Sequence, residues 1–223
     1  MNTTDKKNIL LGSVIGVIPV IWAALIAAPY MRNGIPFVSR SVTDLANDYL
    51  KHSKSRHRAA KSLIRNQIAK CGTSGFITGL GGVITLPVAV PANVGSVLYV
   101  QMRMIASIAY IGGFDPREDQ VQTLAYACLT GSSVADVLKP TGIRIGEKIA
   151  EAGIKRIPGE VLVKINQKVG FRLLTKFGEK GAINFIKLVP AVGGIIGGVV
   201  DVTSTRLMAD NAYRLFIKKE MPK

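Results

Sequence analysis

Residues 72–119 read "GTSGFITGLGGVITLPVAVPANVGSVLYVQMRMIASIAYIGGFDPRED", and this stretch decides the fold class. Up to Asp115 it holds a single charged residue, Arg103, so it belongs in a domain core or in lipid. Its first half is rich in Gly and Thr, and Pro87 and Pro91 interrupt it. Because proline disrupts a helix interior, we expect no simple membrane-spanning helix in that half.

The second half of this stretch has the apolar spacing of a helix, from Ala92 to Tyr110. The sequence "GGFDPRED" then ends that helix and begins another, with Asp115 as the expected N-cap and Pro116 in the first turn. A short apolar helix follows and stops near Gly131. Helices joined by tight turns predict an all-α fold, a helical bundle with Gly-rich apolar helical hairpins.

A second glycine-rich run, residues 189–206, reads "VPAVGGIIGGVVDVTSTR". Glycines four residues apart on a helix leave a groove that lets another backbone approach closely, and this spacing recurs in the most apolar segments. We therefore expect close helix contacts, either in lipid or in a domain core. Asp201 follows these glycines and should pair with Arg206, Thr203 or the backbone. The expected close-packing positions are Gly12, Gly16, Gly75, Gly79, Gly193, Gly194, Gly197 and Gly198.

The N-terminal stretch from Asn8 to Tyr30 contains no charged residue. As a helix, residues 9–28 would be about 30 Å long, which matches the hydrocarbon core of a bilayer. We therefore predict a transmembrane or membrane-inserted anchor over residues 1–32. A buried core helix and a cleaved signal peptide are the alternatives.

The whole chain is both apolar and basic. It is 48% hydrophobic, and 29 Lys and Arg outnumber 14 Asp and Glu, for a formal net charge of +15. Its mean hydropathy is +0.30. This combination favours an anionic membrane surface as the partner, with nucleic acid as the other usual partner of a basic protein. Cys71 and Cys128 lie among small apolar residues and are expected to be buried thiols.

Two regions concentrate the positive charge. Residues 41–70 have the pattern of one long polar helix, with Ser41 as N-cap and Asp44 in the first turn, and no acidic residue occurs from Lys51 to Lys70. Residues 139–180 end in a Lys or Arg at every fourth position beside an apolar series, which indicates a cationic amphipathic surface. The basic residues expected to contact lipid or a partner are Lys51, Lys54, Arg56, Arg58, Lys61, Arg65, Lys164, Lys168, Arg172, Lys176 and Lys180.

Three stretches together resemble the EcsC-like family of bacterial proteins: "SGFITGLGGVITLP", "QMRMIASIAYIGGFDP" and "VPAVGGIIGGVVDVTSTRLMADNAYRLF". The resemblance covers about residues 60–217 and implies a mostly helical protein without an established activity. The polar residues on positions that match the family pattern are Gln101, Arg103, Asp115, Asp201 and Arg206.

The sequence therefore divides into four expected parts. They are the hydrophobic anchor at 1–32, a basic connecting helix at 33–70, an EcsC-like helical domain at 71–217 and a basic tail at 218–223. We expect the bulk of the chain to lie on the cytoplasmic side of the bacterial inner membrane.

Residue patterns typical of catalysis are missing from the sequence. His52 and His57 both lie in the basic run, far along the chain from either cysteine, and no phosphate-binding glycine loop or cluster of zinc ligands occurs. We expect no enzyme activity and no cofactor.

Three hypotheses for the function remain. The first is a membrane-associated, non-enzymatic protein whose basic helices engage anionic phospholipid or a membrane protein partner. The second is an effector that forms homo-oligomers through its glycine faces and permeabilises a bilayer, in bacterial competition or phage defence. The third, which the low aromatic content of 6% makes the least favoured, is a soluble nucleic-acid-binding protein.

Overall fold

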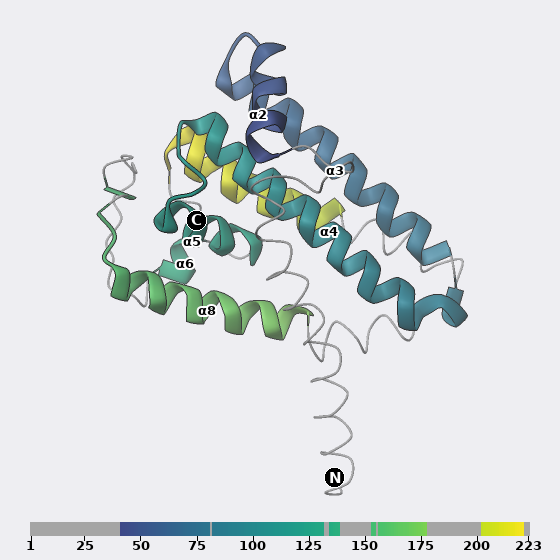
Figure 1. Ribbon diagram of the computed structural model, residues 1–223. Coiled ribbons are helices and arrows are strands. Elements are labelled where there is room, and N and C mark those ends of the chain that lie inside the picture. The colour runs from purple at the N-terminus through teal and green to yellow at the C-terminus, as the bar shows by residue number, and fades with distance from the viewer. Residues whose placement is uncertain are drawn as a thin grey trace, which may run out of the picture.

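The computed structural model describes residues 41–80, 82–131, 134–138, 153–154, 156–177 and 202–220, and every regular element among them is a helix (Figure 1). The predicted all-α fold is thus confirmed for this part of the chain. The elements are α2 (Val42–Lys51), α3 (Arg56–Leu80), α4 (Gly82–Gly112), α5 (Asp119–Leu129), α6 (Val134–Leu138), α8 (Gly159–Phe177), a helix over residues 202–212 and its π-helical continuation η2 (Tyr213–Lys218).

The predicted N-terminal anchor, residues 1–32, lies outside the described residues. Among the helices that are described, none combines the length and the apolar character needed to cross a bilayer.

Helix α2 begins where the sequence predicted it. The Ser41 hydroxyl accepts a hydrogen bond from the Asp44 backbone N–H at 3.1 Å, and Asp44 supplies the negative charge that the start of a helix favours. Val42, Leu45 and Ala46 are buried on its inner face.

The prediction of one helix from Ser41 to Lys70 is wrong, because the chain breaks after Lys51. At the break, the His52 ring nitrogen Nδ1 lies 2.7 Å from the Asp48 carbonyl oxygen, and the Ser55 hydroxyl accepts from the Arg58 backbone N–H at 3.3 Å. These side chains satisfy backbone groups that a continuous helix would pair internally, so one helix ends and the next begins.

Helices α3 and α4 form the longest pair in the described chain. Helix α4 begins at Gly82, ahead of the expected start at Ala92, and continues through Pro87 and Pro91. Each proline removes one backbone donor but fixes a φ angle that a helix accepts, so here neither one ends the helix. The helical part of this stretch is therefore longer than the sequence analysis expected, because the two prolines do not interrupt it.

The C-terminal helix packs against both members of this pair. The Gln101 amide donates to the Thr205 hydroxyl at 2.9 Å, and Gly112 lies against the carbonyl of Phe216, so residues 202–218 run parallel to α4. Contacts of Gly72 with Val202 and of His57 with Tyr213 show that they run antiparallel to α3.

One hydrophobic core joins these helices with α2, α5 and α8. In Figure 1, α8 forms an outer layer over α5 and α6, and Leu162, Ile165 and Val169 are buried among the side chains of α8 that the structure describes. The largest side chains that are almost completely buried are Phe216, Leu63, Met104, Ile105, Ile108, Ile111, Leu124, Leu129, Ile154, Ile165 and Met208.

The turn between α4 and α5 differs from the prediction. Glu118, not Asp115, occupies the N-cap position of α5, which begins at Asp119. The Asp115 carboxylate instead accepts the Arg117 backbone N–H at 2.9 Å and closes a local turn before the helix. The predicted end of this helix near Gly131 is confirmed, since that residue has a φ of 67°.

Candidate functional site

Three cations on α3 form the most regular charged surface in the described chain, and we name Arg58, Lys61 and Arg65 the α3 basic stripe. At 100° per residue these positions fall within an arc of about 60° on the helix. The side chains of all three are exposed. The buried positions of the same helix, including Leu63 and Gln67, centre on the opposite side. The stripe is therefore the outward face of α3.

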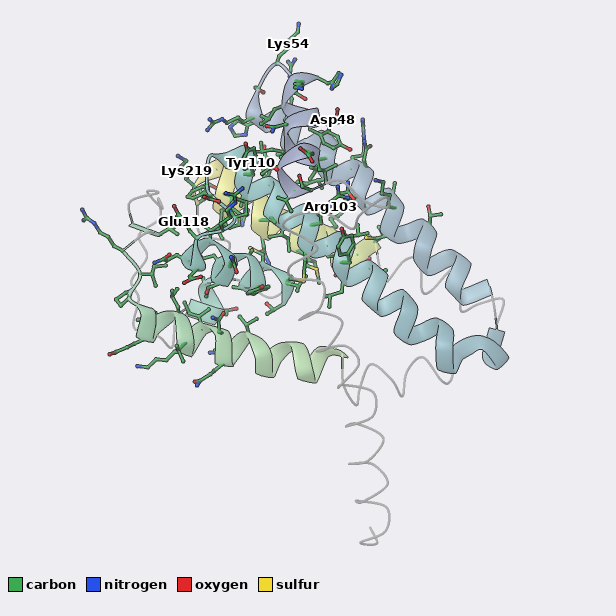
Figure 2. The ribbon with its side chains drawn as sticks, viewed as in Figure 1. Asp48, Lys54, Arg103, Tyr110, Glu118 and Lys219 are labelled. Carbon is green, nitrogen blue, oxygen red and sulfur yellow. The ribbon has the colours of Figure 1, made fainter. Side chains whose placement is uncertain are left out.

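The turn between α2 and α3 adds further exposed cations, Lys51 and Lys54, and Figure 2 shows Lys54 at the outer tip of this turn. No acidic residue lies between Lys51 and Lys70 in the sequence. Among the described residues, neither these two lysines nor the α3 basic stripe forms an ion pair. The positive charge of this surface is therefore not neutralised locally.

Arg56 was predicted to belong to the same surface, and it is exposed, but it also has an internal role. Its guanidinium nitrogen Nη1 donates to the Gly112 carbonyl oxygen at 3.4 Å. A cation at this position satisfies a carbonyl at the C-terminus of α4 and complements the negative end of that helix. Arg56 thus ties the start of α3 to the end of α4.

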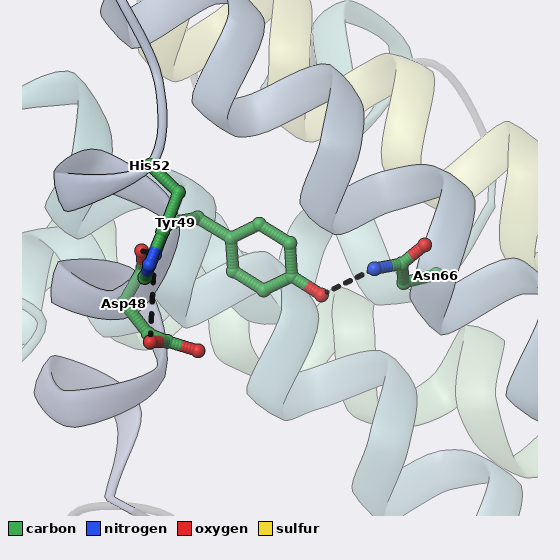
Figure 3. A network of polar contacts seen from close by, with 4 residues as sticks. All are labelled: Asp48, Tyr49, His52 and Asn66. Carbon is green, nitrogen blue, oxygen red and sulfur yellow. Dashed lines mark hydrogen bonds and ion pairs between the residues drawn. The ribbon is translucent and has the colours of Figure 1, made fainter.

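The α2 helix is fastened beside this surface by a polar contact to α3. The Asn66 amide donates to the Tyr49 hydroxyl at 2.8 Å (Figure 3). One turn further along α2, the His52 ring lies 3.7 Å from the Asp48 carboxylate. The Tyr49–Asn66 contact thus holds α2 against α3 beside the stripe.

The second predicted basic helix is only partly described. Lys164 of α8 is exposed and Lys168 is half-buried. Arg172 and Lys176 lie within α8, but their side chains, like the whole of Lys180, are outside the described residues.

The predicted close-packing glycines can be located only in part. Gly75 and Gly79 lie in the distal part of α3. The other predicted positions are outside the described residues: Gly12, Gly16, Gly193, Gly194, Gly197 and Gly198.

The structure instead shows close approach at two glycines that the spacing did not select. A Cβ at Gly112 would overlap the carbonyl oxygen of Phe216, and one at Gly72 would lie 2.7 Å from a methyl carbon of Val202. The signal for Gly112 was present as the paired glycines in "GGFDP", but nothing in the local sequence identifies Phe216 as its partner.

Gln101 is the family-matching residue whose role is clearest. Its side chain is 2% exposed, and the amide donates to the Thr205 hydroxyl at 2.9 Å and to the Ser204 hydroxyl at 3.4 Å. It therefore joins the α4 signature to the C-terminal signature inside the core. Arg103, two residues after Gln101, is half-buried, Arg206 is exposed, and Asp201 lies outside the described residues.

The sequence analysis missed several buried or paired polar groups. The Ser107 hydroxyl donates to the Val42 carbonyl at 3.2 Å, and the His57 ring nitrogen lies 3.0 Å from the Tyr213 hydroxyl. The Lys219 ammonium lies 5.8 Å from the centre of the Phe114 ring. Gln67 is 3% exposed, and its amide nitrogen has no hydrogen-bond partner among the described residues. Only contacts distant in sequence identify these roles, so no local signal revealed them.

Both cysteines are free and buried, as predicted. Burial raises the pKa of the Cys128 thiol far above its ordinary value, so this thiol stays protonated and unreactive at neutral pH. Within the described residues, no group of three or more His, Cys, Asp or Glu is arranged to hold a metal ion.

The described residues thus form an all-helical bundle with one hydrophobic core and an exposed basic stripe. The family model of the EcsC protein family matches residues 24–219, and the chain belongs to that family. The match begins earlier than the sequence resemblance, which started near residue 60, so it also takes in α2.

Comparison with curated proteins gives a more distant relative, the Bacillus subtilis (strain 168) protein YdbA, described as uncharacterized. It is 24% identical over 164 residues, which are 73% of this chain and 57% of the relative. The matched part thus spans little more than half of that protein. No solved structure matches the chain.

Proposed function

We propose that this protein is a membrane-associated, non-enzymatic helical protein that engages anionic lipid headgroups through its basic helices. The observation that carries the proposal is the α3 basic stripe, which is exposed, opposite the buried face of its helix and unaccompanied by acidic residues. The apolar N-terminal residues 9–28 supply a membrane anchor in this proposal. The protein then lies at the bacterial inner membrane, on its cytoplasmic side.

The energetics favour such a contact over a neutral surface. Each Lys or Arg near an anionic leaflet contributes about 1 kcal/mol, so three adjacent cations contribute about 3 kcal/mol, or roughly a hundredfold in partitioning. Their long apolar stems can lie along the membrane interface while the charged ends reach the phosphates. The same basic residues would also contact an acidic surface on a membrane protein partner.

The test is co-sedimentation of the full chain with vesicles of phosphatidylcholine alone or mixed with phosphatidylglycerol. The variant R58Q/K61Q/R65Q removes three charges from the stripe. The matched control R117Q/R156Q/R206Q removes three exposed charges from three other places, the α4–α5 turn, the turn before α8 and the C-terminal helix. We expect the stripe variant to lose at least tenfold in binding to the anionic vesicles, and the control to lose less than about threefold.

Equal losses for the two variants would show that net charge, and not this surface, governs binding. Failure of the wild-type chain to prefer anionic vesicles would refute the proposed function. Salt dependence alone would not separate lipid from nucleic acid, because both contacts weaken with salt. Duplex DNA added as a competitor therefore forms the second arm, and displacement of the protein from vesicles at stoichiometric DNA would favour the nucleic-acid hypothesis.

A further inference from the structure

Both histidines of the chain lie at the junction between α2 and α3, inside the basic surface. His52 directly follows α2, and His57 is the second residue of α3. Both side chains are exposed. In the sequence, Lys51 precedes them, Lys54 lies between them and the α3 basic stripe follows. Because imidazole is the side chain whose charge ordinarily changes between about pH 5 and 8, this surface holds groups that titrate in that range.

The contact of His52 is compatible with a charged ring. Its nitrogen Nδ1 lies 2.7 Å from the Asp48 carbonyl oxygen, which can only accept, so this nitrogen is the donor whether the ring is neutral or protonated. The Asp48 carboxylate lies 3.7 Å from the same nitrogen (Figure 3), and the neighbouring charges in the chain are Lys51 and Lys54. A proton added to the other ring nitrogen therefore leaves the end of α2 intact.

His57 meets the C-terminal helix through a group that can donate or accept. Its nitrogen Nδ1 lies 3.0 Å from the Tyr213 hydroxyl, and the two rings meet edge to face with their centres 5.9 Å apart. A neutral ring nitrogen accepts from this hydroxyl, and a protonated one donates to its oxygen. Desolvation raises the pKa of the Tyr213 hydroxyl, so this group stays neutral in the same pH range. The contact therefore also survives protonation of the histidine.

The charged residues around His57 come from its own helix and from the C-terminal helix. Those near it on α3 are all cations, namely Arg56, Arg58 and Lys61, the last one turn further along. On the C-terminal helix, Asp210 pairs with Arg214 at 3.7 Å, and Glu220 pairs with Lys218 at 3.9 Å. Each acidic residue in the described range 202–220 thus already has a cation partner. A proton on His57 therefore adds to the positive charge of the surface.

We propose that His52 and His57 make the binding of this surface to anionic phospholipid depend on pH, with tighter binding at lower pH. The inference rests on the proposed function, because it describes the regulation of the same surface. Each proton adds a positive charge, so the protonated protein binds lipid phosphates more tightly, and binding weakens as the pH rises through the range in which imidazole titrates. Because both histidine contacts are compatible with either charge, we expect the helical fold to be the same at both ends of this range.

The experiment is co-sedimentation of the full chain with phosphatidylglycerol vesicles at about pH 8 and about pH 5.5. The phosphodiester of this lipid keeps its negative charge over that range. One positive charge near an anionic leaflet strengthens partitioning about fivefold, so two histidines that titrate fully correspond to roughly twenty-fivefold. We expect the wild-type chain to bind at least about tenfold more tightly at the lower pH.

Two matched variants fix the charge of both positions. H52Q/H57Q keeps hydrogen-bonding side chains that stay neutral, so its binding should change less than about twofold between the two pH values. H52R/H57R keeps both positions positive, so at about pH 8 it should bind about as tightly as the wild type does at about pH 5.5. The α-amino group and the carboxylates titrate alike in all three proteins.

A second measurement uses the reciprocity of linkage. If protonation favours binding, then binding favours protonation, and vesicles added to the wild-type chain at about pH 6.5 should draw protons from a weakly buffered solution. H52Q/H57Q should take up less than half as many protons under the same conditions.

The outcomes separate this inference from the proposed function. A wild-type chain that binds anionic vesicles equally at both pH values would keep the proposed function and overturn the pH dependence, and so would full pH dependence in H52Q/H57Q. A chain that binds at neither pH would overturn both. Circular dichroism of the same samples reports the fold. A loss of helical signal at the lower pH would also overturn the inference, because acid unfolding would then account for the change in binding.

Discussion

The two parts of the α3–α4 pair share the same secondary structure but not the same kind of sequence. The packed part consists of residues 56–73 of α3 and 97–112 of α4. It is buried on one side against the C-terminal helix, carries the α3 basic stripe on the other side, and has specific contacts at Gln101 and Gly112. The distal part, residues 74–80 of α3 and 82–96 of α4, has a helical backbone and no charged residue. A helix therefore need not have one composition along its length, and α3 changes from a charged helix to an uncharged one near Gly72.

The largest expected effect breaks the packed part at its closest backbone contact. A Cβ at Gly112 would overlap the Phe216 carbonyl oxygen, which is backbone and cannot rotate away. Gly112→Ala should therefore destabilise the protein by about 3 kcal/mol, measured as the free energy of unfolding in urea. Gly159→Ala is the control, since nothing lies within 4 Å of the added methyl, and it should change stability by less than about 0.5 kcal/mol.

The same substitution at Gly79 tests whether the distal part of α3 is packed differently. In a helix interior with room for a methyl group, alanine is favoured over glycine by up to about 1 kcal/mol, so a loosely packed distal part predicts that Gly79→Ala leaves the protein as stable or makes it more stable. A loss at Gly79 similar to that at Gly112 would mean that the distal part packs as tightly as the bundle, as its glycine spacing predicted. The comparison between the two parts would then fail.

The sequence allowed the helical class, the family and the buried cysteines to be predicted, because each depends on composition or on a short pattern. It also located the Ser41 cap, where a hydroxyl three residues before Asp44 is a local signal. Predictions failed where two local signals competed. Pro87 and Pro91 indicated a boundary, yet the helix continues; the serines near residue 55 were weaker signals, yet the helix breaks there.

The candidate site was less predictable than the fold. Exposure of the α3 basic stripe follows from its helical spacing, so that part could be predicted. The internal role of Arg56 could not, because its carbonyl partner at Gly112 is distant in sequence. For the same reason, Gln101 could be selected by its position in the family pattern but not assigned to Thr205, which lies on another helix.

A smaller effect is expected at the polar contact inside the packed part. Gln101→Leu keeps a similar volume but removes the donor to Thr205 and Ser204, and leaves a buried hydroxyl without this partner. The expected loss is about 2 kcal/mol in urea unfolding, within the range for an uncompensated buried polar group. Gln122→Leu is the matched control, because its amide donates to the Arg117 carbonyl at an exposed position and should cost less than about 0.5 kcal/mol. Equal losses at both positions would show that the buried contact contributes nothing specific.

The smallest effect should have the opposite sign and concerns the matching glutamine on α3. Gln67 is as buried as Gln101, but its amide nitrogen has no partner among the described residues, so the protein bears the cost of removing that donor from water. Gln67→Met keeps the length of the side chain and removes the unpaired amide, and it should stabilise the protein by about 1 kcal/mol. Urea unfolding of Q67M, Q101L and the double variant measures whether the two sites are independent. A loss of stability in Q67M would mean that Gln67 is hydrogen-bonded in solution, and that the two glutamines serve the packed part of the hairpin in the same way.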